Sequence, residues 1–245
     1  MVKIKKFPWH QISFALAVLF SVLFLYFSLK PNASAGVRRL SGLCRALLLS
    51  ELVLETKLPD DDSRIAQGEK AILYVLGGSQ KSLVYKFKKA AIIYKKGLAG
   101  KILVLSDPGL TEYDPALRRN LRNDEWAMKV LEQQNIPKER VDFVSLPEGI
   151  FGSLREGKRI SELAIVRGYG KLILVTSDHH TRRVSLVFGQ FLEHRIHELY
   201  VYGAAEEVGL KELIREYFKL LLYKHVLLPA CHLWPTLPYA IHSPI

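Results

Sequence analysis

The stretch LILVTSDHHTRRVSLVF, residues 172–188, decides the fold because it passes directly from an apolar run into a helical pattern. Residues 172–176 are short and almost continuously apolar, which is typical of a strand buried on both faces. Further along, apolar residues recur at the i, i+3, i+4, i+7 spacing of one helix face: Val184, Val187, Phe188 and Phe191. The stretch therefore predicts one strand followed by one helix.

The same pattern occurs at four other places along the chain. Short runs rich in Ile, Leu and Val, each followed by a helical segment, stand at residues 71–76, 102–105, 141–146 and 199–202. Such alternation implies a parallel sheet with helices on both faces, because right-handed crossovers place them there. We therefore predict an α/β domain over residues 70–228, a Rossmann-like three-layer sandwich with a mostly parallel sheet of about five strands.

Length and charge limit the possible classes of protein. The 245 residues are 49% hydrophobic, which is enough for one sizeable core and makes a second full domain unexpected. Lys and Arg number 35 against 24 Asp and Glu, so the formal net charge is +11. A basic excess of this size indicates an anionic partner, which is nucleic acid, anionic lipid or a phosphorylated molecule.

An uncharged apolar segment at residues 12–29 is long enough for a transmembrane helix. A basic flank at residues 1–11 precedes it, and Trp9 and Tyr26 stand near its ends, where interfacial aromatic residues belong. The alternative is a secretory signal peptide, because Ala33-Ser34-Ala35 suits a cleavage site. We favour an uncleaved anchor, since the apolar run exceeds a usual signal core.

Under both interpretations the domain is exported if the N-terminus stays in the cytoplasm. The charges on the two sides of the apolar segment do not fix that orientation. We expect a single-pass protein of the inner (plasma) membrane with an extracytoplasmic, or periplasmic, domain. Residues 30–69 would then be a juxtamembrane region, with an amphipathic helix at 37–55 and a polar linker at 57–69. The helix is expected to lie on the domain or on the bilayer interface.

The C-terminal part begins with a long apolar-periodic helix. This helix is predicted at residues 210–228, ending before Pro229, and residues 229–245 form a proline-rich tail. Cys44 and Cys231 are the only cysteines. We expect free thiols, with a disulfide as the alternative if the domain is exported.

Small and polar residues follow the predicted strands. The first four strand ends are followed by Gly77-Gly78-Ser79, Ser106-Asp107-Pro108-Gly109, Pro147-Glu148-Gly149 and Thr176-Ser177-Asp178-His179-His180. Parallel strands deliver their carboxyl ends to one edge of a sheet, where helix N-termini also converge. We therefore expect a ligand site at this edge.

Familiar nucleotide and metal motifs do not match the sequence. Gln80 stands where a phosphate loop needs glycine before the lysine, and no G-x-G-x-x-G follows the first strand. Standard use of NAD or ATP is therefore not expected and the cofactor stays unknown, although Asp107 could accept a hydrogen bond from a ribose hydroxyl. Adjacent histidines point about 100° apart on a helix, and no other ligands stand at metal-site spacing, so no metal is expected.

Several stretches resemble, in order along the chain, the ElyC/SanA/YdcF family of bacterial envelope-associated proteins. These are LYVLGGS, AAIIYKKGLAGKILVLSDPG, NDEWAMKVLEQQNIPKERV, PEGIFGSLREG, LVTSDHHTRRVSLVF and IREYFKLLLY. The resemblance covers residues 71–223, and V-T-S-x-x-H-x-x-R is its most specific part. It implies a Rossmann-like domain of unknown function, often carried by a single-pass inner-membrane protein, and a role in cell-envelope and peptidoglycan biogenesis.

The resemblance also marks particular positions as functional. They are Gly77, Gly78, Ser106, Glu125, Glu148, Ser153, Glu156, Thr176, Ser177, His180 and Arg183. The chain departs from the family pattern at Asp107-Pro108, where glycine is usual after the serine. Ser153 stands where threonine is common, and Lys86 lies near a position often filled by arginine.

His180 and Arg183 are the leading candidates for ligand contact. They stand three apart in the first turn of a predicted helix, so they project together near the strand ends. An anion there would meet free N–H groups, the helix dipole and a guanidinium able to donate two parallel hydrogen bonds. The alternative is that Ser177 or Asp178 caps the helix and the histidines lie in solvent.

Other candidate residues also have a structural interpretation. Ser153 and Glu156 fit the S-x-x-E capping box, Glu125 suits the first turn of a helix, and Gly77-Gly78 suits a tight turn. The lysines of the first crossover helix are expected on its outer face, in solvent or against anionic lipid. They are Lys81, Lys86, Lys88, Lys89, Lys95, Lys96 and Lys101.

We expect the site to bind, and to process if chemistry occurs, a phosphorylated or otherwise anionic ligand such as a lipid-linked or nucleotide-linked cell-wall precursor. The expected ligand-binding residues are Gly77, Gly78, Ser79, Ser106, Asp107, Glu125, Thr176, Ser177, His180 and Arg183. His180 is the candidate acid/base, because its ordinary pKa lies near neutrality. Two alternatives stay open: a non-catalytic interaction module of an envelope assembly, and a nucleoside-ligand binder such as one for S-adenosylmethionine. No nucleic-acid-binding module is recognised in the sequence.

Overall fold

The computed structural model describes residues 35–54, 71–106, 108–146, 152–192 and 198–233. The chain forms two compact units, Met1–Ser50 and Glu51–Ile245, and each is described by itself. The predicted sheet and its helices belong to the second unit.

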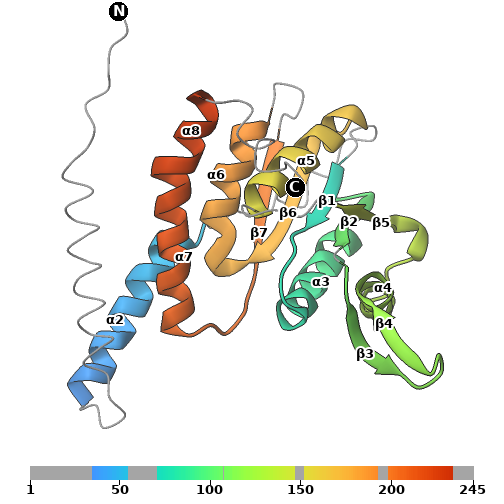
Figure 1. Cartoon of the computed structure of the whole chain (residues 1–245), viewed down its shortest axis with the longest axis horizontal. Helices are drawn as coiled ribbons and strands as arrows, with labels where there is room; N and C mark the ends of the chain where they lie inside the picture. Colours follow the sequence, from blue (N-terminus) through green and yellow to red (C-terminus); the bar gives the residue numbers. More distant parts are fainter. Residues whose placement is uncertain (1–34, 55–70, 107, 147–151, 193–197, 234–245) are drawn as a thin grey trace, which may run out of the picture. The chain divides into compact units, whose positions relative to one another are not determined.

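Five parallel strands form the sheet (Figure 1). They are β1 (Ala71–Val75), β2 (Lys101–Ser106), β5 (Val141–Ser145), β6 (Lys171–Ser177) and β7 (Glu198–Ala204). The order across the sheet is β5-β2-β1-β6-β7, and every neighbouring pair is parallel. The chain therefore winds outward from β1 in one direction and from β6 in the other, as in doubly wound folds. The predicted α/β class and parallel sheet are confirmed.

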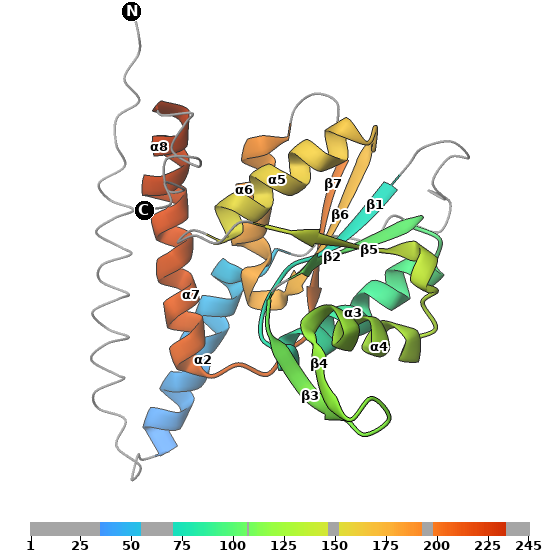
Figure 2. The ribbon, with the colours of Figure 1, turned by 45° about the vertical axis from the view of Figure 1, so that its right-hand side comes forward.

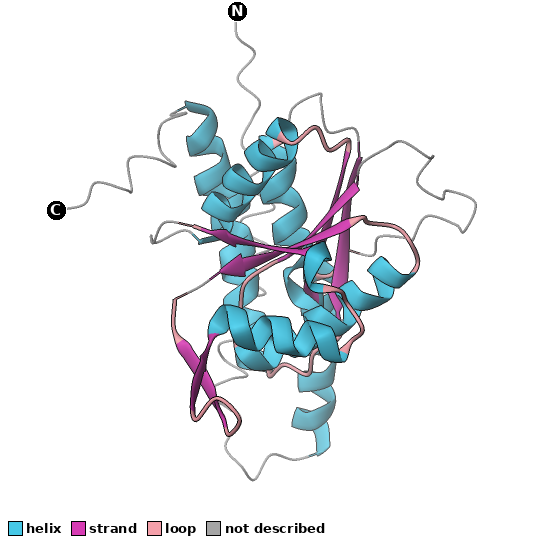
Figure 3. Cartoon of the chain, turned by 90° about the vertical axis from the view of Figure 1, so that its right-hand side faces the viewer, coloured by secondary structure: helices cyan, strands magenta, loops and turns pink. Residues whose placement is uncertain are grey.

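Helices cover both faces of this sheet, as Figure 3 shows. The longer ones are α3 (Gln80–Lys95), α4 (Asn123–Gln133), α5 (Gly152–Val166), α6 (Thr181–Phe191) and α7 (Leu210–Leu222). Side chains of a strand alternate between faces, so Leu73 packs in one core with Phe87 of α3, and Tyr74 packs in the other with Phe188 of α6. The predicted apolar stripe of α6 is confirmed, because Val184 and Val187 are buried in the same core. The three layers agree with the predicted sandwich.

A hairpin that the sequence did not suggest follows β2. Strands β3 (Leu110–Asp114) and β4 (Arg119–Arg122) pair antiparallel and form a separate two-stranded sheet. Figure 2 shows the hairpin projecting beyond α3 and α4. The expectation that a helix follows β2 directly is wrong here, because LTEYD is a short, mostly exposed strand without a continuous apolar run.

The C-terminal helix extends further than predicted. After α7, the chain forms a π-helical turn, η3 (Tyr223–Leu227), and continues as α8 (Leu228–Leu233). The expectation that the helix ends before Pro229 is wrong. Pro229 is the second residue of α8, and proline is tolerated in the first turn of a helical segment, where its missing N–H is least needed.

The first unit contains most of α2 (Ala35–Leu52), which agrees with the helix predicted after the apolar segment. Among the described residues, no helix combines the length and the apolar character that crossing a membrane requires. The predicted transmembrane segment at 12–29, the linker at 57–69 and the last residues of the tail lie outside the described residues. Cys44 and Cys231 are free thiols, as expected.

Candidate functional site

The carboxyl ends of β1 and β6 lie side by side where the winding of the sheet reverses. Val75 pairs with Val175, and the next residue of the first strand, Leu76, donates its N–H to the Val175 carbonyl at 3.0 Å. At the end of β6, Ser177 Oγ lies 3.0 Å from Ser82 Oγ of α3 and donates to Glu206 Oε2 at 2.9 Å. Because Ser177 has one hydroxyl proton, Ser82 must be the donor to Ser177. This chain of hydroxyls ties α3 to the loop after β7.

Lys86 lies buried under the glycine turn that follows β1. Its ammonium donates to the carbonyl oxygens of Gly77 at 2.7 Å and Leu76 at 3.3 Å, and only 2% of the residue is exposed. A Cβ at Gly78 would lie 2.9 Å from Lys86 Nζ, so glycine is needed for this close approach. The expectation that Lys86 belongs to the outer basic face of α3 is wrong. Lys81, Lys88, Lys95 and Lys96 of that group are exposed.

Burial lowers the pKa of Lys86 from 10.5 to about 8. Glu156 and Glu206 oppose this shift by attraction, and Arg183 adds to it by repulsion. A buried ammonium with a lowered pKa at the ends of parallel strands marks a candidate functional site, because burying a charge costs stability.

Glu216 of α7 holds His180 and Arg183 together. Its Oε1 lies 2.9 Å from His180 Nδ1 and also accepts a hydrogen bond from Arg183 Nε. The Glu216 side chain is 2% exposed. Although burial opposes ionisation, the His180 hydrogen bond and the Arg183 charge lower the pKa of Glu216 to about 2. The carboxylate is therefore ionised at neutral pH.

Arg183 is consequently not free to clamp an anion with two parallel donors, as the sequence suggested. Its Nε donates to Glu216 and its Nη1 donates to Ser153 Oγ. The guanidinium carbon also lies 5.4 Å from the centre of the Tyr223 ring, within cation–π range. His180 and Arg183 do project together, as predicted, but their shared partner is a carboxylate of the protein itself.

The capping box proposed for Ser153 and Glu156 is not the role that these side chains have. Helix α5 begins at Gly152, so Ser153 lies inside the helix and its hydroxyl accepts from Arg183. Glu156 accepts a hydrogen bond from the Tyr74 hydroxyl at 3.1 Å. Both residues therefore face the strand ends.

Of the two histidines, His179 is buried and His180 is only partly exposed, so the expectation that both lie in solvent is wrong. They form a 3₁₀ turn, η2 (Asp178–His180), between β6 and α6. His179 is 5% exposed, its ring centre lies 4.0 Å from that of His180, and burial lowers its pKa to about 4. Ser177 precedes this turn without a side-chain capping bond, although the alternative interpretation required one from Ser177 or Asp178.

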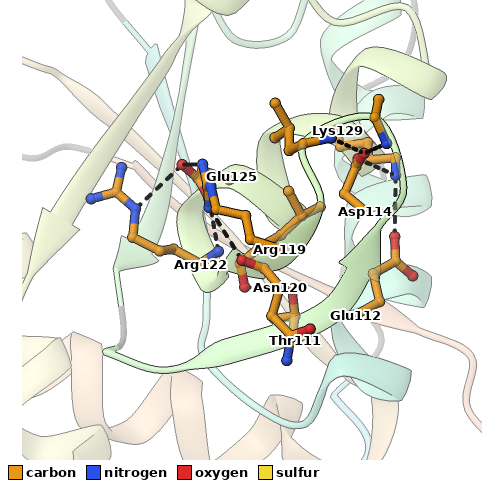
Figure 4. A network of polar contacts seen from close by, with 11 residues as sticks. Thr111, Glu112, Asp114, Arg119, Asn120, Arg122, Glu125 and Lys129 are labelled. Carbon is orange, nitrogen blue, oxygen red and sulfur yellow. Dashed lines mark hydrogen bonds and ion pairs between the residues drawn. The ribbon is translucent and has the colours of Figure 1, made fainter.

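Glu125 belongs to a different polar network, shown in Figure 4. Its carboxylate accepts two hydrogen bonds from Arg119 of β4, at 2.7 and 2.8 Å, and one from the Arg122 backbone N–H at 2.8 Å. In the same view Lys129 lies between Glu112 and Asp114 of the hairpin. Glu125 therefore fastens the hairpin to α4, which favours its structural interpretation.

The other predicted site residues have mixed outcomes. Thr176 is buried at the end of β6. Gly78 and Ser79 are exposed in the turn before α3. The Ser79 side chain caps this helix by accepting a hydrogen bond from Ser82 N at 3.3 Å. Ser106 Oγ donates a hydrogen bond to Asp124 Oδ2 at 2.8 Å, so its partner is not one of the residues that contact His180. Asp107 and Glu148 lie outside the described residues.

Sequence reasoning missed two residues of the site, Glu206 and Glu216, and it did not predict that Lys86 points inward. Within the part of the chain that the structure describes, no group of three His, Cys, Asp or Glu side chains is arranged to hold a metal ion. The fold and site define a doubly wound α/β protein with a cluster of charged side chains near the carboxyl ends of β1 and β6. No family model, no curated protein and no solved structure matches the chain.

Proposed function

We propose that this protein binds a phosphorylated small molecule at the carboxyl ends of β1 and β6. The observation that carries the proposal is the Lys86 ammonium, which lies buried directly under the Gly77-Gly78 turn. The turn leads into the N-terminus of α3, so backbone N–H groups and the positive end of the helix dipole lie next to the same ammonium.

The glycine at residue 78 supports the same function. Gly78 is exposed and has no side chain, and the position that a Cβ would take there lies 2.9 Å from the buried Lys86 Nζ. Two of the three ammonium protons are used by the carbonyls of Leu76 and Gly77. The third is available to a phosphoryl oxygen, which would also restore the charge interactions that burial removes.

We place this activity in a membrane and envelope setting as part of the same proposal. The resemblance to the ElyC/SanA/YdcF family and the apolar segment at residues 12–29 support a single-pass protein with an extracytoplasmic domain. The ligand would then be a lipid-linked or nucleotide-linked precursor of the cell wall, since these molecules carry phosphoryl groups.

An alternative function is a non-catalytic interaction module of an envelope assembly. Phe218, Leu222 and Val226 are exposed at spacings of four along α7 and η3, which forms an apolar stripe on the surface. If this alternative holds, substitution of the stripe abolishes function in cells, whereas substitution of Lys86 does not.

Phosphate binding by matched lysine variants tests the proposal. Calorimetric titration with inorganic phosphate, pyrophosphate and a phosphodiester compares the wild-type chain with Lys86→Met and with Lys88→Met, an exposed lysine of the same helix. We expect wild type and Lys88→Met to bind and Lys86→Met to lose about tenfold or more in affinity, because one charge-assisted hydrogen bond contributes about 1.5–3 kcal/mol. Equal affinity in all three proteins, or no binding by wild type, would refute the proposal.

A further inference from the structure

We propose that the site hydrolyses a phosphodiester, with His180 as the general base and Glu216 as the residue that positions it. This inference rests on the proposed phosphoryl binding and adds a reaction to it. Four observations support it: the hydrogen-bond geometry of His180, the difference in exposure between the two residues, the groups that surround the imidazole, and the charge balance of the side chains at the strand ends.

The geometry fixes which nitrogen of His180 carries the proton. Glu216 Oε1 lies 2.9 Å from Nδ1, and an ionised carboxylate can only accept a hydrogen bond. Nδ1 is therefore the donor, and the lone pair of the neutral ring is on Nε2. Arg183 Nη2 lies 3.4 Å from Nδ1 and cannot donate to a nitrogen that already bears a proton.

Exposure assigns different roles to the two side chains. The His180 side chain is 26% exposed, whereas that of Glu216 is 2% exposed. Water and substrate can therefore reach the imidazole, but they cannot reach the carboxylate behind it. Glu216 acts through His180, as the buried carboxylate does in a Ser-His-Asp triad.

His180 stays neutral because burial and two nearby cations outweigh one carboxylate. The charged groups that act on the ring are Glu216 from α7, Arg183 from α6 and Lys86 from α3, and the uncharged His179 of η2 lies beside it. Burial, together with the charges of Arg183 and Lys86, lowers the pKa of His180 below 6.5, while the bond to Glu216 opposes this shift. At neutral pH the imidazole can therefore accept a proton.

The charge balance of the site bears on the class of substrate. Lys86 and Arg183 face Glu156, Glu206 and Glu216, which leaves one net negative charge among these groups. A phosphomonoester brings about two further negative charges at pH 7. A phosphodiester brings only one, so repulsion by the net negative charge of these groups is smaller for the diester than for the monoester.

The proposed step is balanced and requires only water as a second reactant. The oxygen of a water molecule forms a bond to phosphorus while one of its protons passes to His180 Nε2. The bond between phosphorus and the leaving oxygen then breaks, and that oxygen takes the proton from Nε2. The Lys86 ammonium compensates the charge that develops on the phosphoryl oxygens.

Hydrolysis of bis(p-nitrophenyl) phosphate by the full-length chain in detergent tests the inference, with p-nitrophenyl phosphate as the monoester comparison. We expect wild type to prefer the diester and to show a rate that rises with an apparent pKa below 6.5. His180→Gln leaves the Glu216–Arg183 pair intact and should lower kcat about 10²-fold or more. Glu216→Gln should lower kcat by a similar factor with little change in phosphate affinity.

A spectroscopic measurement separates a positioning role from a structural one. Nitrogen-15 NMR of the histidine ring should show Nδ1–H as the tautomer of His180 in wild type and a mixture of tautomers in Glu216→Gln. Should Glu216→Gln not fold, the wild-type tautomer and the His180→Gln rate still decide the question. Absence of diester hydrolysis by wild type, or an Nε2–H tautomer, would overturn the inference. If wild type fails to bind phosphate at all, the proposed function itself has failed.

Discussion

Lys86 Nζ lies 2.7 Å from the carbonyl oxygen of Gly77, at the turn that joins the first strand to the first helix of the sheet. This contact places a buried positive charge at the reversal point of a doubly wound fold, where such folds bind ligands. A helix capped by Ser79 continues directly from the turn, so the charge and the helix N-terminus act on the same small region.

Lys86 should make the stability of the protein depend on pH in the alkaline range. Its pKa is about 8 in the folded state and 10.5 otherwise, so the unfolded chain binds more protons between these values. Stability should therefore rise with pH from about 8 to 10.5, by about 3 kcal/mol at 1.36 kcal/mol per unit. Urea unfolding of wild type and Lys86→Met over this range measures the difference. Parallel curves for the two proteins would contradict this assignment.

Replacing Gly78 should disturb the site more than replacing another glycine. The Cβ of Gly78→Ala would lie 2.9 Å from Lys86 Nζ, at a positive φ that side chains rarely adopt, whereas a Cβ at Gly100 meets no atom within 4 Å. We expect Gly78→Ala to lose about 1–3 kcal/mol of stability and to weaken phosphate binding. Gly100→Ala should stay within about 1 kcal/mol of wild type. Equal effects, measured by thermal unfolding and calorimetry, would argue against the close approach.

Glu216 should contribute to stability above its ordinary pKa of 4.5 and lose that contribution as the pH falls. Its folded pKa is about 2, so the unfolded chain binds the extra proton between pH 4.5 and 2, and stability falls through this window. The loss is about 3 kcal/mol at 1.36 kcal/mol per unit. In Glu216→Gln the same window should show a shallower fall. An identical acid profile in chemical denaturation would show that the carboxylate is not held by His180 and Arg183.

Glu125 is expected to lie outside the ligand site. Because its carboxylate is bound by Arg119 and by the Arg122 backbone, Glu125→Gln should leave phosphate affinity unchanged. It should lower stability only slightly, because the variant weakens a helix N-terminal bond and an ion pair that solvent screens. A loss of phosphate affinity in Glu125→Gln would extend the site toward the hairpin.

The five strands could be predicted because each is a short run of apolar residues that the sheet buries on both faces. The hairpin after β2 could not, since LTEYD is mostly exposed and has no continuous apolar run. His180 and Arg183 were placed correctly because helical spacing alone brings residues three apart together. Their partner Glu216 comes from a helix distant in sequence, and spacing within one helix cannot reveal such a contact.

Two signals in the sequence nevertheless indicated buried charges. Lys86 stands four residues from both Ser82 and Ala90, which are buried in the same helix. Glu216 stands between Leu213 and Leu220 on the buried face of α7. A charged residue that lies within the apolar stripe of a helix is buried together with that stripe. Lysine and glutamate are usually exposed, and this general preference led to the wrong expectation for Lys86 and to the omission of Glu216.

The pKa of Lys86 with and without phosphate tests the central claim most directly. Carbon-13 NMR of labelled lysine side chains can follow the titration of Lys86, identified by its absence in Lys86→Met. Without ligand we expect a pKa of about 8. Saturating inorganic phosphate should raise it, because a bound anion stabilises the ammonium form. A Lys86 pKa that phosphate leaves unchanged would contradict anion binding at the ends of β1 and β6.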